Sequence, residues 1–203
     1  ALLARGVGPG DEVIVPAQTH VATAHSVEHC QAMPVFVDAE IETGNIDISQ
    51  IEPKVGERTK AISVVHYLGL PVNMDAVNAI ASKYDLSVIE DAALAIGSRY
   101  RNVHAGLLGD AGCFSFYPVK HITTVEGGML VTRHDDIAGD VERRRAFGMD
   151  KTIAERKVPG MYDVTMLGAN YRMNEVEAAI GLEQLKKIDD WLAARRANYE
   201  TLA

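Results

Sequence analysis

Residues 113–128, CFSFYPVKHITTVEGG, combine the end of a strand-like run with a single lysine. The run is mostly apolar or aromatic up to Tyr117, and Pro118 ends it because proline lacks the N–H that a central strand needs. Lys120 follows two residues later. The sequence therefore places one primary amine at the mouth of a strand that is expected to be buried.

Short apolar runs of the same kind recur along the chain and alternate with stretches of helical periodicity. Continuous apolar strands separated by helices predict a three-layer α/β/α fold with a mainly parallel sheet, whose ligands lie at the carboxyl ends of the strands. The predicted strands are 12–16, 34–38, 59–66, 86–91, 111–117 and 128–132. The predicted helices are 19–29 with Thr19 as its cap, 74–84, 135–145, and one long amphipathic helix from Asn174 onward.

Composition excludes several classes of function. The net charge of −8 disfavours nucleic-acid and membrane-surface binding. Two cysteines without metal spacing indicate a reduced, cytoplasmic protein, and no apolar run reaches the length of a membrane span. The histidines show no zinc spacing, so no metal is expected, and the chain has no P-loop, dinucleotide fingerprint or Gly-x-Ser-x-Gly elbow.

Asp91 ends another predicted strand and is followed by the small residues Ala92 and Ala93. A partly desolvated lysine amine is a nucleophile that forms Schiff bases, and a carboxylate with small neighbours leaves room for a flat ring whose nitrogen it keeps protonated. This pair is the minimal set for pyridoxal 5'-phosphate (PLP) chemistry. The residues alone leave a second interpretation open, a structural Lys–Asp salt bridge, which is the commoner outcome.

The chain resembles the DegT/StrS family of PLP-dependent sugar aminotransferases, which have the aspartate aminotransferase fold. The resemblance covers nearly all residues and is carried by separate stretches in the family's order. They are GDEVIVP (10–16), PVFVD (34–38), VIEDAA (88–93), SFYPVK (115–120) with TTVEGG (123–128), and NYRMN (170–174) with EAAIG (177–181).

The resemblance implies a role for each matching residue. Lys120 matches the lysine that forms the Schiff base with the cofactor, and Asp91 matches the partner of its pyridine nitrogen. Ser115 matches a serine that binds the cofactor phosphate. His20 stands where the family usually has an aromatic ring stacked on the cofactor, and a flat imidazole can stack there too.

Two further positions are implied near the C-terminus, together with departures from the family pattern. Asn170 or Arg172 falls where the family has a residue that reaches the phosphate of the neighbouring subunit's cofactor, which implies a homodimer. Leu94 stands where the family often has Gln or His touching the cofactor. The family's phosphate loop and small domain have no counterpart here, so residues 1–203 are expected to form a partial PLP-binding large domain that holds PLP poorly alone.

The implied function is transfer of an amino group from glutamate to a nucleotide-linked keto-sugar, in the making of polysaccharide or antibiotic sugars. One branch of the family has histidine in place of the lysine and dehydrates sugars instead. Because Pro118 fixes the register at Lys120, the sequence favours transamination over dehydration. A catalytically incomplete fragment that only dimerises is a further alternative.

Overall fold

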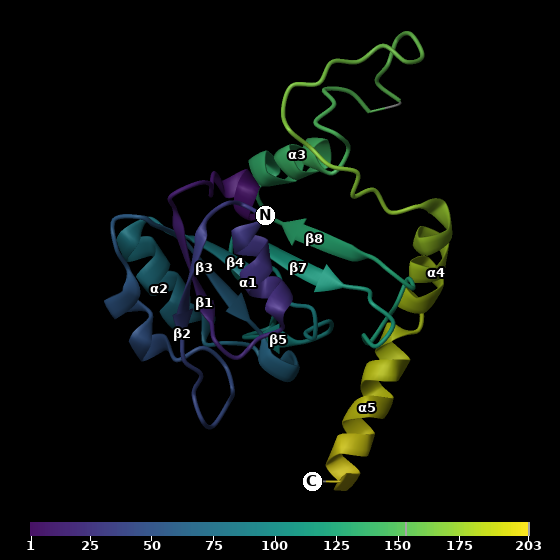
Figure 1. The fold of residues 1–203 in the computed structure, drawn as a ribbon. Coiled ribbons are helices and arrows are strands. Elements are labelled where there is room, and N and C mark those ends of the chain that lie inside the picture. The colour runs from purple at the N-terminus through teal and green to yellow at the C-terminus, as the bar shows by residue number, and fades with distance from the viewer. Residues whose placement is uncertain (153, 203) are drawn as a thin grey trace.

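A computed structural model describes residues 1–152 and 154–202 and contains one six-stranded sheet in the order β2-β1-β3-β4-β7-β8 (Figure 1). The expected fold class is confirmed, and the predicted strand bounds agree with the observed ones to within two residues. Positions 153 and 203 of the predicted domain lie outside the described residues. The strands are β1 (Glu12–Pro16), β2 (Met33–Val37), β3 (Thr59–Val65), β4 (Ser87–Asp91), β7 (Ala111–Ser115) and β8 (Gly128–Thr132).

The sheet is parallel from β2 to β7, and only β8 runs antiparallel to its neighbour β7. The carboxyl ends of β1, β3, β4 and β7 therefore meet at one edge of the sheet. The register brings Val65 beside Asp91 and Asp91 beside Cys113. This edge carries the segments that the sequence singled out.

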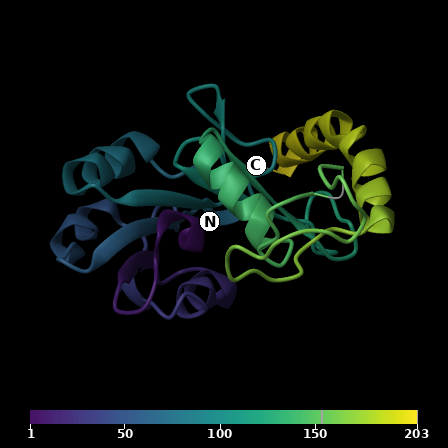
Figure 2. The ribbon, with the colours of Figure 1, turned by 90° about the horizontal axis from the view of Figure 1, so that it is seen from above.

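Two separate apolar clusters cover the two faces of the sheet, as successive side chains of a strand point to opposite faces. Val13, Val15 and Ile89 belong to the first cluster, together with side chains of the helices α1 and α3. Ile14 and Val88 belong to the second cluster, together with α2. Figure 2 shows α1 and α2 on opposite sides of the strands, which is the expected three-layer arrangement.

The helices begin at side-chain caps in most cases. His20, rather than the expected Thr19, caps α1, because its ring Nδ1 accepts a hydrogen bond from the Ala22 N–H. Asn174 caps α4 through a capping box with Glu177, as the sequence suggested. The helices are α1 (Val21–Glu28), α2 (Met74–Tyr84), α3 (Asp135–Arg144), α4 (Glu175–Leu185) and α5 (Ile188–Leu202).

The single long C-terminal helix that the sequence predicted is divided in two. Between α4 and α5 the helical ladder is interrupted at Lys186 and Lys187. Figure 1 shows α4 beside the tip of β7 and α5 leading away from the sheet to the C-terminus. In the described part of the chain no helix is both long enough and apolar enough to cross a membrane.

Several short elements complete the fold. A small hairpin of β5 (Arg99–Tyr100) and β6 (Val103–His104) turns at Arg101 and Asn102, whose φ angles of 46° and 66° are those of a type I′ turn. The sequence analysis missed it, because Arg-Asn lacks the usual Asn-Gly signal. The 3-10 helices are Leu2–Arg5, Ile48–Gln50, Glu52–Lys54 and Tyr67–Gly69.

Candidate active site

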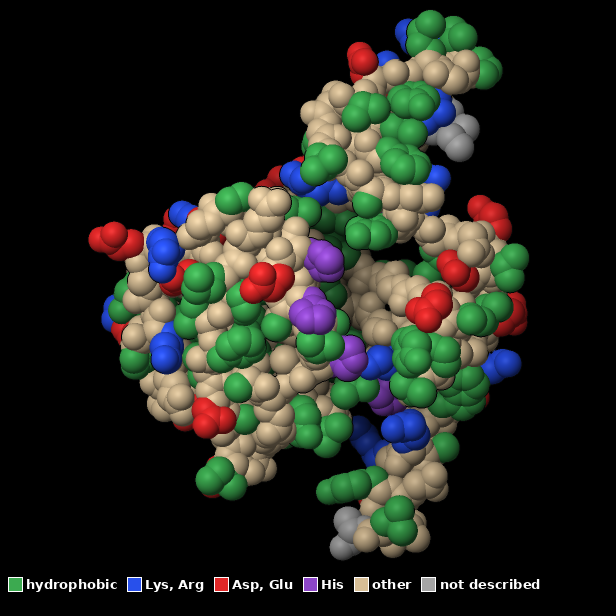
Figure 3. All heavy atoms as spheres, in the orientation of Figure 1, with side chains coloured by type: hydrophobic (Ala, Val, Ile, Leu, Met, Phe, Trp, Pro, Cys, Tyr) green, Lys and Arg blue, Asp and Glu red, His purple; other side chains and the backbone are tan. Residues whose placement is uncertain are grey.

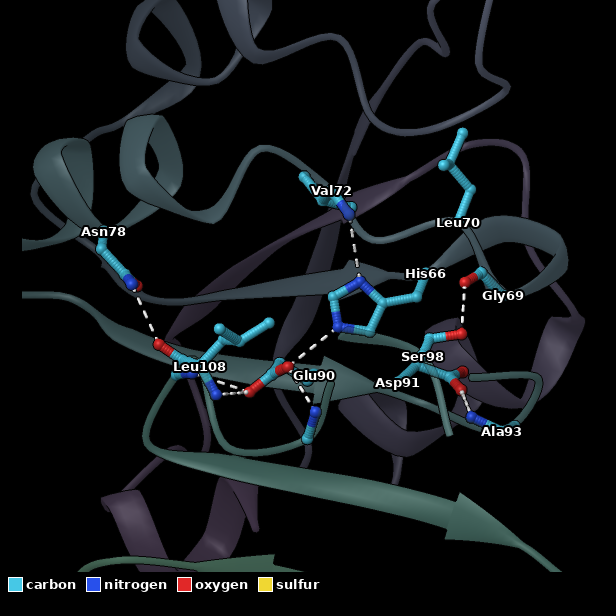
Figure 4. Close-up of polar contacts among 12 residues, drawn as sticks. His66, Gly69, Leu70, Val72, Asn78, Glu90, Asp91, Ala93, Ser98 and Leu108 are labelled. Carbon is cyan, nitrogen blue, oxygen red and sulfur yellow. Dashed lines mark hydrogen bonds and ion pairs between the residues drawn. The ribbon is translucent and has the colours of Figure 1, made fainter. Parts of the chain in front are cut away.

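Asp91 is fixed at the carboxyl edge by two hydrogen bonds from different elements. Thr23 in α1 donates from Oγ1 to Asp91 Oδ2 at 2.8 Å, and the Ala93 N–H donates to Asp91 Oδ1 at 3.0 Å. Figure 4 shows the Asp91 side chain turned toward the Ala93 amide. Each carboxylate oxygen thus accepts one bond and keeps a lone pair for a further donor.

Ser115 ends the neighbouring strand β7, two residues beyond Cys113, which pairs with Asp91. Its Oγ accepts the Tyr117 N–H at 3.3 Å, so its own hydroxyl proton stays available for another acceptor. Burial, followed by the charges of Asp91 and Glu90, raises the pKa of the Cys113 thiol, which is therefore protonated at neutral pH.

Lys120 follows β7 after a tight turn in which its own N–H donates to the Tyr117 carbonyl at 3.0 Å. The residue is half-buried. Among residues 1–152 and 154–202, the Lys120 Nζ makes no hydrogen bond and no ion pair. Glu126, the nearby carboxylate in the sequence, does not pair with it either. The salt bridge to Asp91 that remained an alternative interpretation is therefore absent from the described contacts, and the amine is not committed to a structural partner.

The loop after Lys120 is held by both β7 and α4. The Phe116 carbonyl accepts the Thr124 N–H at 3.0 Å and the Thr123 hydroxyl at 2.9 Å. The Thr123 N–H in turn donates to Gln184 Oε1 of α4 at 2.7 Å. Val125 in this loop has a φ of 73°, a strained conformation for a β-branched residue.

His121 lies directly beside the lysine and is held neutral. Burial, then the charges of Arg195 and Lys120, lower the pKa of its imidazole. Its Nδ1 is buried and has no hydrogen-bond partner among the described residues. A neutral ring here adds no like charge next to the Lys120 amine.

His20 stands at the start of α1, directly after Thr19, and its side chain is exposed. Because Nδ1 serves as the helix cap, the ring is anchored on one side. Figure 3 shows histidine side chains along the rim of a hollow between the body of the sheet and the C-terminal helices.

Asn170 and Arg172 lie apart from the other predicted site residues. Asn170 pairs with Ala146 in an isolated bridge, and the Arg172 guanidinium lies 5.1 Å from the centre of the Phe147 ring. Arg172 also lines a cavity of about 740 Å³ between the end of α3 and residues 149–152 and 154–156. No described contact joins either residue to Asp91, Ser115 or Lys120 of the same chain, so their part in a site stays a prediction.

Glu90 is a polar residue to which the sequence assigned no role. It is fully buried, and its carboxylate accepts hydrogen bonds from His66 Nε2 and from three backbone N–H groups (Figure 4), those of Gly106, Leu108 and Gly109. Burial raises the pKa of Glu90, but the bonds from His66, Gly109 and Gly106 outweigh it and hold the pKa below its usual value. A charged residue inside an apolar strand was the available signal.

No group of three or more potential metal ligands gathers in the described ranges.

Comparison with known proteins identifies the chain's relatives. The model of the DegT/DnrJ/EryC1/StrS aminotransferase family matches residues 1–203. A GDP-perosamine synthase of Caulobacter vibrioides is 47% identical over 195 residues, which are 96% of this chain and 51% of that protein.

Solved structures agree with these matches. An aminotransferase from Psychrobacter cryohalolentis superposes with a TM-score of 0.93 at 38% identity, covering 98% of this chain and 52% of that one. DesV from S. venezuelae superposes with a TM-score of 0.89 at 34% identity, covering 97% and 51%. The chain spans about half the length of the curated relatives that it matches.

Proposed function

The chain belongs to the DegT/DnrJ/EryC1/StrS aminotransferase family, and from this membership we propose that the complete protein is a PLP-dependent aminotransferase. It moves the amino group of glutamate to a keto-sugar carried by a nucleotide. The relative named GDP-perosamine synthase supports a sugar product of this kind. The observation that carries the proposal is the uncommitted Lys120 amine at the sheet edge that also holds Asp91.

The residues present at this edge fit the cofactor. Asp91 keeps a lone pair on each oxygen for a ring N–H donor, and Lys120 Nζ has no structural partner among the described residues. The Ser115 hydroxyl proton is available for a phosphate oxygen, and the His20 ring is exposed for stacking. When bound, PLP supplies an electron sink for the carbon from which a proton is removed.

Lys120 has two tasks in this proposal. Its Nζ would hold the cofactor covalently before the amino donor arrives. Once displaced, the same amine would carry the proton from the donor's α-carbon to the aldehyde-derived carbon of the cofactor, and in the second half-reaction it would carry a proton from there to the sugar carbon that receives the amino group. The neutral His121 beside it leaves the amine free of like-charge repulsion from that ring.

Asp91 acts by fixed charge, because its carboxylate keeps the ring nitrogen protonated, and that charge is worth more at a partly buried edge than in water. Ser115 orients the phosphate. Removal of the amino group from glutamate uses one water and releases 2-oxoglutarate. Addition of that amino group to the keto-sugar releases one water. The two half-reactions therefore balance without another reductant or oxidant.

Dehydration is the less favoured reaction. The residue at the key position is Lys120, whereas the dehydrating branch has histidine there. His121 cannot substitute for it by a shift of register, because Pro118 and the turn from Tyr117 to Lys120 fix the alignment.

Isotopic labelling tests the proposed reaction in the complete protein. The protein is incubated with PLP, 15N-glutamate and a panel of nucleotide-linked keto-sugars, and products are analysed by mass spectrometry. Transamination places 15N in the sugar and forms 2-oxoglutarate. Loss of water without 15N would instead identify a dehydratase. Residues 1–203 alone are assayed in parallel, and turnover by the complete protein but not by this chain would support the incomplete-fragment alternative.

The homodimer and the cytoplasmic location are part of the same proposal. The two free thiols, Cys30 and Cys113, are compatible with a reducing compartment.

Mixed dimers test the place of Arg172. If Arg172 serves the neighbouring subunit's site, each dimer of one inactive Lys120→Ala chain and one inactive Arg172→Ala chain contains one intact site. A one-to-one mixture then recovers about a quarter of the sites. Lack of recovery would place Arg172 in its own subunit's site or in neither.

A further inference from the structure

Two threonine hydroxyls and Asp91 form a chain of hydrogen bonds with one direction. Thr23 Oγ1 lies 2.8 Å from Asp91 Oδ2, and Thr19 Oγ1 lies 2.8 Å from Thr23 Oγ1. An ionised carboxylate accepts only, and a threonine hydroxyl has one proton. Thr23 therefore gives its proton to Asp91, and Thr19 must be the donor to Thr23.

Helix capping does not explain this arrangement. The Ala22 N–H at the start of α1 is capped by His20 Nδ1, and the Thr23 N–H donates to the His20 carbonyl. Neither threonine side chain is needed for the helix. Thr23 is nevertheless a buried polar residue, 5% exposed, on the same helix as Val27 of the first apolar cluster.

We call the hydrogen-bonded series Thr19–Thr23–Asp91 the relay. It holds one carboxylate oxygen of Asp91, while a backbone N–H holds the other. Thr23 holds Oδ2, and the Ala93 N–H holds Oδ1, so rotation of the Asp91 side chain is restricted from both sides. Hydrogen bonds to a carboxylate stabilise its charged form, and a donor that itself accepts a bond is strengthened.

We propose that Thr19 and Thr23 are positioning residues that orient Asp91 and stabilise its anion, so that the proton shared with the cofactor's ring nitrogen stays on the nitrogen. This inference rests on the proposed function, because it assumes that Asp91 faces that nitrogen. Without the Thr23 hydroxyl the Asp91 anion is less stabilised, and the shared proton moves toward the carboxylate.

Four variants of the complete protein test the relay. Thr23→Val removes the hydroxyl at constant shape, Thr23→Ser retains it, and Thr19→Val removes only the outer donor. Thr59→Val is the matched control, because Thr59 is also 5% exposed and its Oγ accepts the Gly56 N–H at the opposite edge of the sheet. Two readouts that do not depend on turnover are the dissociation constant for PLP and the 15N shift of ring-labelled PLP.

We expect Thr23→Val to weaken PLP binding about ten-fold and to move the ring 15N signal toward that of unprotonated pyridine. Thr23→Ser should restore both readouts to within about two-fold of wild type, and Thr19→Val should shift both in the same direction by a smaller amount. Thr59→Val should lower the unfolding stability without changing either readout.

The relay is refuted if wild type binds PLP while Thr23→Val matches it in affinity and 15N shift. If Thr23→Val does not fold, Thr19→Val decides by the same criteria, since Thr19 is only half-buried. A wild-type protein that binds no PLP at all overturns the proposed function, and the relay with it. The wild-type sample thus separates the two failures.

Discussion

Glu90 Oε2 lies 2.8 Å from His66 Nε2, and neither side chain is exposed to solvent. His66 Nδ1 accepts the Val72 N–H, so the ring proton sits on Nε2 and is donated to Glu90. The pair therefore ties the turn after β3 to β4, the strand that ends in Asp91. Through its backbone partners Glu90 also fixes the loop of residues 106–109 that leads into β7.

Replacing Glu90 by glutamine should destabilise the fold by about 3–5 kcal/mol at pH 7. The amide nitrogen of glutamine would face two donors that now meet a carboxylate oxygen. Urea unfolding measures the loss. Glu183→Gln, which breaks an exposed pair with Lys186, should change little and serves as the control. Equal stability of Glu90→Gln and wild type would contradict the assigned network.

The same carboxylate should produce a dependence of stability on acid. Because the pKa of Glu90 is lowered in the folded state from 4.5, its contribution is present above that pH and is lost as pH falls through the folded value. The difference in unfolding free energy between wild type and Glu90→Gln should therefore shrink below pH 4.5. A difference that stays constant down to acid unfolding would show that the shift has the wrong sign.

Gly112→Ala should destabilise the protein by about 3 kcal/mol, because a Cβ there would lie 2.2 Å from Gly106 Cα and 2.4 Å from its carbonyl oxygen. Backbone atoms cannot move aside as a side-chain tip does. Gly139→Ala in α3 meets nothing within 4 Å and should instead add about 0.5–1 kcal/mol. Thermal unfolding of both variants compares them, and a stable Gly112→Ala would refute the close approach of β7 to the loop at Gly106.

Val125→Asn should stabilise the loop beside Lys120 by about 1 kcal/mol, since asparagine tolerates the left-handed backbone that valine resists. The Val125 side chain is 61% exposed, so little packing is lost. Chemical denaturation provides the measurement. A less stable asparagine variant would mean that Val125 makes contacts worth more than its strain.

Ser115→Ala should weaken PLP binding about ten-fold while leaving the covalent bond to Lys120 possible, because one hydrogen bond to a charged phosphate is lost. Equilibrium binding followed by absorbance gives the affinity. Ser26→Ala in α1, whose hydroxyl donates to the Thr23 carbonyl, is a helix-surface control expected to bind normally. An unchanged affinity in Ser115→Ala would remove Ser115 from the phosphate site.

The sheet was predictable because its strands are short, mostly apolar runs, and the inner strands β1, β3 and β4 are buried along most of their length. The edge that carries Asp91 and Lys120 followed from the strand ends alone. The break between α4 and α5 was not predictable, since apolar residues continue through Leu185, Ile188 and Trp191 at helical spacing.

Long-range partners were beyond the sequence. Thr23 and Asp91 are 68 positions apart, and His66 and Glu90 are 24 apart. Their pairing depends on the order of the strands and on the place where α1 packs, which no local pattern encodes. The sequence predicts Thr19 as the helix cap because it precedes an apolar stretch. In the structure the Thr19 hydroxyl instead bonds to Thr23, and the cap of α1 is His20.

The covalent state of Lys120 tests the central claim most directly. The complete protein is incubated with PLP, reduced with borohydride, digested and analysed by mass spectrometry, with Lys120→Ala and the exposed-lysine variant Lys60→Ala treated in parallel. We predict one phosphopyridoxyl group on Lys120 in wild type and Lys60→Ala and none in Lys120→Ala. Labelling of another lysine, or of Lys120→Ala to the same extent as wild type, would contradict the account.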